Sequence, residues 1–277
     1  MRLLGWILSV VMLTWLSSNV VANAADATSD QPRPRLGKSA ICKGYGPQAP
    51  RDISKKSGIN RRLFTLAPPY QKMNLCNIHT HTNAEHKGPG FSIFTGSDAH
   101  GGFKCNTSQG LTERQSRMPE GKLTYKNVKP GDTIEVHWVF SSCDVAPGHG
   151  LGACSSETCA NPQLRVESQV FLLVNDRRAL DFRDFDYEPR RITGFHQPIR
   201  IPARTGDPIV FAGSTTGTKY DRSQCSPLQV TWSVRPRCAM LDINTLNAWG
   251  ADNVFGEDHS HGVRPLVTAL ELLAPIE

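Results

Sequence analysis

Two histidines, His79 and His81, lie two residues apart in a segment that reads as an extended strand. Alternate side chains of a strand emerge from the same face, so both imidazoles point to one side of a sheet. Imidazoles gathered on one face are typical of a metal site. Glu85 and His86 follow within one short turn, and they offer a carboxylate and a third imidazole as outer partners or as a further ligand.

A second strand carries another histidine. Residues 133–140 alternate with period two, so that Glu135, His137 and Val139 share one face. The residues of the opposite face are apolar, which predicts a strand with its back in a core and its front at a site. Glu135 precedes His137 by two residues and can accept the outer N–H of a ligating ring.

His79, His81 and His137 together match the requirements of a catalytic zinc site, which has three protein ligands and one open position. Three neutral imidazoles leave the ion its double charge, which lowers the pKa of a bound water to about 7. Imidazole suits several borderline metals. We therefore expect Zn²⁺, with Co²⁺ or Cd²⁺ as substitutes.

Other histidines compete for the same role. His86 is the rival third ligand, although its adjacency to Glu85 is also consistent with plain hydrogen bonding. A second His-x-His pair, His259 and His261, has the loop-forming neighbours Gly, Glu and Asp, so its rings need not share a face. We expect a hydrogen-bonding role for this pair rather than metal ligation.

The elements that position these residues are mostly strands. Apolar or alternating runs predict strands at residues 133–140, 170–174, 199–201, 208–212 and 228–234. Loops are expected at residues 88–110 and 144–161, and residues 266–273 fit either a helix or a strand. The expected fold is β-rich mixed α/β, a single domain around a large twisted, mostly antiparallel sheet with short helices.

The N-terminus has the pattern of an export signal. Arg2 precedes an apolar run over residues 3–16, and Ala22-Asn23-Ala24 forms a small-residue cleavage site. We expect a signal peptide over residues 1–24, a disordered leader over 25–40 and a catalytic domain over 41–277. No later segment reaches about 20 apolar residues, so the mature protein is expected to be soluble, periplasmic or secreted, without membrane insertion.

The number of cysteines and the distribution of charge narrow the class of protein further. The eight cysteines all follow the signal segment, and an even number in an exported chain predicts up to four disulfides. No Cys-x-x-Cys pair occurs, which disfavours a cysteine-rich metal site. The formal charge of +6 is scattered rather than collected in a basic stripe with exposed aromatic residues, which argues against nucleic acid as a partner.

The run over residues 76–87, Cys-Asn-Ile-His-Thr-His-Thr-Asn-Ala-Glu-His-Lys, resembles the signature of the delta-class carbonic anhydrases. The likeness extends over most of the mature chain, including residues 131–143 and 257–264. A weaker resemblance is to the alpha-class enzymes, in which a His-x-His strand, a Glu-His pair, a Glu-x-His-x-Val strand and a Gly-Ser-Leu-Thr-Thr turn precede a Val-Thr-Trp strand. The corresponding segments here occur in the same order, at residues 79–81, 85–86, 135–139, 213–216 and 230–232.

The resemblance implies an alpha-class-like fold and an enzyme that hydrates carbon dioxide reversibly to bicarbonate and a proton, by attack of metal-bound hydroxide. It implies that the metal ligands are His79, His81 and His137. Secreted alpha-class enzymes join two regions that correspond to Cys42 and Cys225, so the resemblance makes these two cysteines a plausible bridge.

Further residues take their roles from the same resemblance. Thr215 would hydrogen-bond the hydroxide and pass its proton to Glu85, a gate that aims a hydroxide lone pair at carbon dioxide. Val139 and Thr216 would line the pocket for the gas. The connection from His81 to Glu85 is much shorter than in the alpha class, and an insertion follows the Thr-Thr turn.

Several alternatives stay open at this point. No residue maps onto the alpha-class proton-shuttle histidine, which leaves His86 and His100 as candidates. A cupin-like metalloenzyme shares the His-x-His-x-x-x-Glu core, but Met73 and Ser92 stand where its flanking glycines belong, and its second motif is missing. A non-catalytic carbonic-anhydrase-related binding protein would lack a ligand, and a metal carrier would use a closed ligand set.

Overall fold

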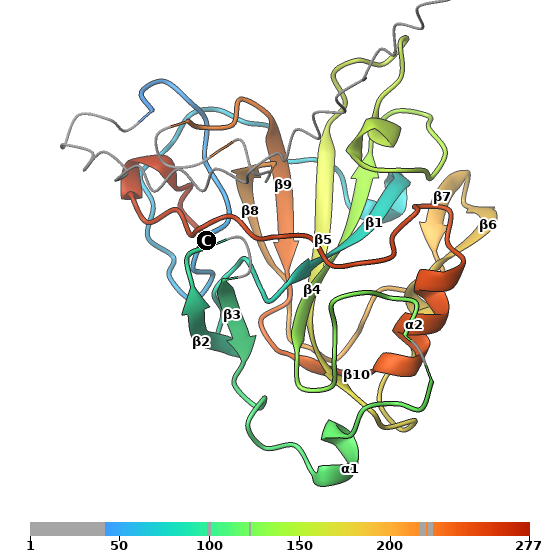
Figure 1. Ribbon diagram of the computed structural model, residues 1–277. Helices are drawn as coiled ribbons and strands as arrows, with labels where there is room; N and C mark the ends of the chain where they lie inside the picture. Colours follow the sequence, from blue (N-terminus) through green and yellow to red (C-terminus); the bar gives the residue numbers. More distant parts are fainter. Residues whose placement is uncertain (1–41, 99–100, 122, 216–219, 221–223) are drawn as a thin grey trace, which may run out of the picture. The chain divides into compact units, whose positions relative to one another are not determined.

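The computed structural model describes residues 42–277 except 99–100, 122, 216–219 and 221–223 (Figure 1). The expected signal peptide and leader, and the side chains of His100 and Thr216, lie outside the described residues. Within the described part, no helix is long and apolar enough to cross a bilayer.

The main sheet has six strands in the order β1-β4-β5-β9-β8, with β10 also paired to β5. Its strands are β1 (Asn74–Thr82), β4 (Thr133–Ser141), β5 (Leu164–Val174), β8 (Ile209–Ser214), β9 (Gln229–Val234) and β10 (Ala239–Asp242). The pairs β1–β4, β4–β5 and β8–β9 are antiparallel, whereas β9 and β10 run parallel to successive halves of β5. The strand-rich mixed fold expected from the sequence is confirmed.

Smaller elements surround this sheet in Figure 1. Two hairpins are formed by β2 (Phe91–Gly96) with β3 (Gly102–Cys105) and by β6 (Tyr187–Ile192) with β7 (Phe195–Pro198). The helices are α1 (Glu113–Ser116), α2 (Ile243–Ala251) and the 3-10 turns η1 (Tyr70–Lys72), η2 (Leu151–Cys154), η3 (Phe182–Phe185) and η4 (Leu270–Leu272).

Strand β4 separates two apolar clusters. Ile134, Val136 and Trp138 belong to one cluster, which includes residues of α2 and η3. Val139 belongs to the other cluster, together with residues of β5, β8 and β9. Because side chains alternate along a strand, His137 lies on the Val139 face. The expected apolar back of this strand is therefore confirmed, and Glu135 and His137 share its other face as expected.

Three local expectations differ from the structure. Residues 88–110 contain the β2–β3 hairpin rather than one long loop, and β3 begins at Gly102, whose φ is +94°. Residues 199–201 are not a strand, since β7 ends at Pro198. Helix α2 was missed, although the side chain of Asp242 caps it by accepting a hydrogen bond from the Asn244 backbone N–H.

The eight cysteines form four disulfides, as their even number predicts: Cys42–Cys225, Cys76–Cys154, Cys105–Cys238 and Cys143–Cys159. The first of these links chain segments 183 residues apart. Cys76 lies in β1, so the Cys76–Cys154 bridge fastens the strand that carries His79 to the turn η2.

Candidate metal centre

The β1–β4 pairing brings three imidazoles together. His79 is the register partner of His137, and His81 is the partner of Glu135. The ring centroids are 5.1 Å apart for His79 and His81, 5.1 Å for His79 and His137, and 4.7 Å for His81 and His137. One nitrogen from each ring lies within 4.8 Å of the others. This spacing fits a single ion bound between them.

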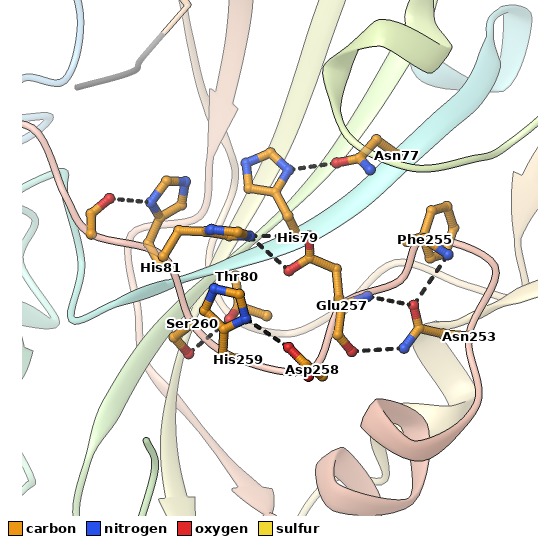
Figure 2. Close-up of polar contacts among 12 residues, drawn as sticks. Asn77, His79, Thr80, His81, Asn253, Phe255, Glu257, Asp258, His259 and Ser260 are labelled. Atoms are coloured by element: carbon orange, nitrogen blue, oxygen red, sulfur yellow. Dashed lines mark hydrogen bonds and ion pairs between the residues drawn. The ribbon is translucent and has the colours of Figure 1, made fainter. Parts of the chain in front are cut away.

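The other nitrogen of each ring faces an acceptor. Nδ1 of His79 lies 2.7 Å from Oδ1 of Asn77, and Nδ1 of His81 lies 2.9 Å from the carbonyl oxygen of Gly262 (Figure 2). Nε2 of His137 lies 3.4 Å from Oε1 of Glu135. Such outer acceptors hold the N–H of a ligating ring and turn its second nitrogen to the metal. These contacts leave Nε2 free on His79 and on His81, whereas Nε2 of His137 faces Glu135 without an aligned hydrogen bond.

Asn77 was missed at the sequence level, although a signal for it exists. It precedes His79 by two residues, so it shares a strand face with this histidine. Its own amide is fixed because Nδ2 donates to the Gly148 carbonyl oxygen at 3.1 Å. The Gly262 carbonyl has no comparable signal, since it belongs to the backbone and lies 181 residues from His81.

The three imidazoles are in an environment that keeps them neutral. His81 and His137 are buried, and His79 is partly exposed. Burial is the main cause that lowers the pKa of all three, and the neighbouring imidazoles lower the pKa of His79 further. Nε2 of His81 is buried and has no hydrogen-bond partner. A neutral imidazole with a buried free lone pair is the form that binds a metal ion.

Glu135 is the hub of the hydrogen bonds behind the site. Its Oε2 accepts the backbone N–H of Glu85 at 2.7 Å and that of His86 at 3.3 Å. Its Oε1 accepts the Ser168 hydroxyl at 2.5 Å and lies 3.0 Å from Nδ1 of His86. Burial opposes ionisation of this carboxyl, but the charge of His86 and hydrogen bonds from His86 and His137 hold its pKa well below the usual range.

Glu85 lies in a contrasting environment. Its carboxylate oxygens are buried without a hydrogen-bond partner, 3.8 Å from Nε2 of His137 and 4.0 Å from Nδ1 of His81 at the nearest approaches. Burial raises its pKa, against an opposing effect of His137. Two neighbouring carboxyls, Glu85 and Glu135, therefore have pKa values pushed in opposite directions, a pattern typical of functional sites.

His86 lies outside the three-imidazole group. Among the described residues, it forms a second possible metal-binding group with Glu85 and His137. Its ring is fully buried and packs against Trp232, with ring centroids 4.7 Å apart. All three members of this second group are buried, whereas the first group includes the partly exposed His79. The first group is therefore the one open to a small molecule from solvent.

Thr215 and Val139 occupy different surroundings. The hydroxyl of Thr215 lies 3.2 Å from Oγ of Ser226, and its carbonyl oxygen accepts a hydrogen bond from Arg264. The structure does not pair it with Glu85, whose oxygens have no hydrogen bond in the described part of the chain. Val139 is buried in the apolar cluster on the His137 side of the sheet.

The second His-x-His pair lies at the edge of the site. His261 has ring centroids 6.1 Å from His79 and 6.3 Å from His81, and His259 lies 4.8 Å from His261. The two rings are neighbours, which the loop-forming sequence around them did not require, and each lies within hydrogen-bond distance of a carboxylate, Asp258 for His259 and Glu257 for His261. Isolated bridges at His259 and His261 hold the loop in an extended form, which places alternate side chains together.

Comparison with protein-family models decides the class. The model for the delta carbonic anhydrases matches residues 70–245, which include β1, β4 and the three imidazoles between them. The chain belongs to the delta carbonic anhydrase family. A search of curated proteins found no match. The family match ends before residues 257–262, so the loop that carries His259 and His261 is outside the matched part of this delta carbonic anhydrase family member.

Proposed function

We propose that the protein is a carbonic anhydrase that interconverts carbon dioxide and bicarbonate, with Zn²⁺ as its metal and Co²⁺ or Cd²⁺ as substitutes. The observation that carries this proposal is the convergence of three neutral imidazoles, each with one nitrogen directed at an outer acceptor, in a member of the delta carbonic anhydrase family. The match to this family disfavours the alternative interpretation of the sequence as a cupin-like enzyme.

His79, His81 and His137 are the proposed metal ligands. The residues fit such an ion because the three rings offer one nitrogen each and because a buried nitrogen of His81 lacks any other partner. A divalent ion held by three neutral imidazoles lowers the pKa of a bound water toward 7 and so supplies a nucleophile at neutral pH. Asn77 and Glu135 keep two of the rings in the ligating orientation.

The remaining residues are proposed to handle the substrate. Val139 is proposed to line the place for carbon dioxide, an apolar gas that favours the buried apolar side of the sheet. Thr216, which lies outside the described residues, is proposed for the same role on the resemblance to the alpha class alone. In the reaction, the water oxygen bonds to the carbon of carbon dioxide, bicarbonate leaves, and one proton is released for each turnover. The four disulfides support an oxidising compartment, and we propose a periplasmic or secreted catalytic domain over residues 41–277 after removal of residues 1–24.

Thr215 and Glu85 are proposed as the gate that orients the attacking oxygen. For this role the Thr215 hydroxyl must exchange its contact with Ser226 for one with Glu85. We expect Thr215→Val to reduce kcat/KM about a hundredfold, the scale of a lost proton-handling group, and Ser226→Ala to leave it nearly unchanged. Equal activity of Thr215→Val and the unchanged protein would rule the gate out.

Stopped-flow hydration of carbon dioxide by Zn²⁺-loaded protein tests the proposed function. The rate should exceed that of buffer with stoichiometric zinc bound, and should vanish after removal of zinc by a chelator. Bound zinc without hydration would disprove the enzyme and leave the non-catalytic relative as the better description.

A further inference from the structure

A cavity of about 350 Å³ adjoins the metal centre on the side of Glu85. Its walls come from the β2–β3 hairpin and from the segment over residues 263–268. Its apolar lining residues are Phe94, Phe103, Val263, Pro265 and Leu266. Of the described residues that line the cavity, none is a proposed metal ligand. A molecule held there can therefore be recognised without any contact to the metal.

Glu85 forms the buried end of this cavity. Its side chain is 0% exposed, and in the described part of the chain neither carboxylate oxygen has a hydrogen-bond partner. A buried acceptor without a partner is costly in free energy. A ligand with an N–H or O–H group can satisfy this carboxylate by a charge-assisted hydrogen bond, without displacing an existing one. The carboxylate therefore selects a ligand that donates a hydrogen bond.

Arg264 brings the opposite charge to the same cavity. It is buried, and its Nη1 donates to the Thr215 carbonyl oxygen at 3.2 Å. A guanidinium has five N–H donors, so it can serve more than one acceptor. Glu85 disfavours an anion and Arg264 disfavours a cation. The two together favour an uncharged group with a donor and an acceptor, such as a primary carboxamide, whose NH2 donates and whose carbonyl oxygen accepts.

Two aromatic rings indicate what the body of the ligand is. Phe94 and Phe103 have ring centroids 5.5 Å apart. Phe103 is buried, whereas Phe94 is 60% exposed, so Phe94 lies at the mouth of the cavity. Aromatic rings pack favourably on one another in offset or edge-to-face arrangements. Since a cavity of about 150 Å³ is enough to hold benzene, this larger cavity has room for a substituted aromatic ring.

We propose that this cavity is a binding site for a small aromatic carboxamide. The NH2 group of the ligand donates to Glu85, its carbonyl oxygen faces Arg264, and its ring packs against Phe94 and Phe103. The site is separate from the place proposed for carbon dioxide, which is on the Val139 side of the sheet.

The consequence for catalysis rests on the proposed function. A ligand on Glu85 occupies the carboxylate that the proposed gate requires, and the hydroxyl of Thr215 then keeps its contact with Ser226. Such a ligand should slow the hydration of carbon dioxide without competing with the gas for its own place.

NMR titration of Zn²⁺-loaded protein with benzamide tests the site without any measurement of activity. We expect a Kd of about 1 mM or below, as for a favourable fragment-sized ligand. Methyl benzoate keeps the ring and the carbonyl group but lacks the N–H donor, so it should bind about tenfold more weakly. Equal affinities of the two compounds would overturn recognition by Glu85. Absence of benzamide binding at about ten times the expected Kd would overturn the site itself.

Substitutions locate the bound compound. Thr268 is exposed and lines the cavity, so Thr268→Trp should block it with little effect on folding. This variant should lose benzamide binding and retain stoichiometric zinc. Thr107→Trp is the matched control, because Thr107 is exposed and is not among the described lining residues. Glu85→Gln removes the charge of the acceptor and should weaken binding about tenfold. Unchanged affinity in both Thr268→Trp and Glu85→Gln would overturn the assigned location.

Stopped-flow kinetics measure the effect on hydration. Benzamide should lower kcat and leave KM for carbon dioxide unchanged, and Thr268→Trp should be resistant to it. Bound benzamide with no effect on kcat would overturn the competition for Glu85. Protein that binds both zinc and benzamide but does not hydrate carbon dioxide would contradict the proposed function, while the titration would still support the binding site.

Discussion

His79 and His137 are direct partners across the antiparallel β1–β4 pair, and their ring centroids lie 5.1 Å apart. A register slip of one residue would turn every side chain of one strand to the opposite face. The metal centre therefore depends on this register, which the apolar core on the opposite face of β4 specifies.

Loss of His137 should abolish metal binding, because two imidazoles from a single strand cannot complete a three-ligand set. His137→Ala should contain far less than one zinc per chain by elemental analysis, and His86→Ala should retain it. Full zinc content in His137→Ala would transfer the third ligand position to His86 or His261.

Asn77 should control metal affinity without touching the metal. Asn77→Ala removes the acceptor for Nδ1 of His79, and loss of such an outer partner typically weakens binding about 10- to 100-fold. Competition with a chromophoric chelator measures this change. Asn106→Ala is a suitable control, because Asn106 is an exposed residue that contacts Ser92 and Pro89 instead of a histidine. Equal zinc affinity of Asn77→Ala and the control would contradict the assigned role.

The metal-free protein should lose stability as pH falls below about 6.5, the pKa of an unperturbed histidine. The folded-state pKa of His81 lies below this value, so the unfolded chain binds more protons and the free energy of unfolding decreases toward low pH. One such histidine contributes a slope of up to about 1.4 kcal/mol per pH unit. Denaturant unfolding between pH 7 and 5 should give a shallower slope for His81→Gln. Identical slopes would contradict the prediction.

The disulfides should contribute differently to the free energy of unfolding, according to the length of chain that each one closes. Removal of Cys42–Cys225, which spans 183 residues, should lower the free energy of unfolding more than removal of Cys143–Cys159, which spans 16. A chain-entropy model gives about 5 kcal/mol for the first and about 3 kcal/mol for the second. Denaturant unfolding of the two double Cys→Ser variants checks this order, and the reverse order would show that native-state contacts dominate.

Local patterns explain which parts of the site the sequence could predict. His79, His81, Glu135 and His137 were found because the two-residue period of a strand can be read without knowledge of its partner. Asn77 obeys the same period and was overlooked. The β2–β3 hairpin was missed because its strands are short and lie within a segment rich in glycine, serine and aspartate, so that no periodic signal develops.

Contacts between segments that are distant in the chain could not be predicted from such local patterns. The Thr215 hydroxyl meets Ser226, and the free carboxylate of Glu85 lies beside His137, because of how loops pack on the sheet. The pairing of His259 with His261 likewise requires the segment to be held extended against β1. Hydrogen bonds to a neighbouring strand impose that form, and a loop-rich sequence does not reveal them.

The sequence by itself determined the strand-rich class, the export pattern, the even set of cysteines and the two strand faces that carry the histidines, because each of these is a local or compositional property. Only the tertiary structure decided the acceptor of the His81 ring, since the Gly262 carbonyl oxygen lies 181 residues away in the chain. It also decided that His259 and His261 lie side by side at the edge of the site, because a segment about 180 residues away in the chain is hydrogen-bonded to the edge of β1.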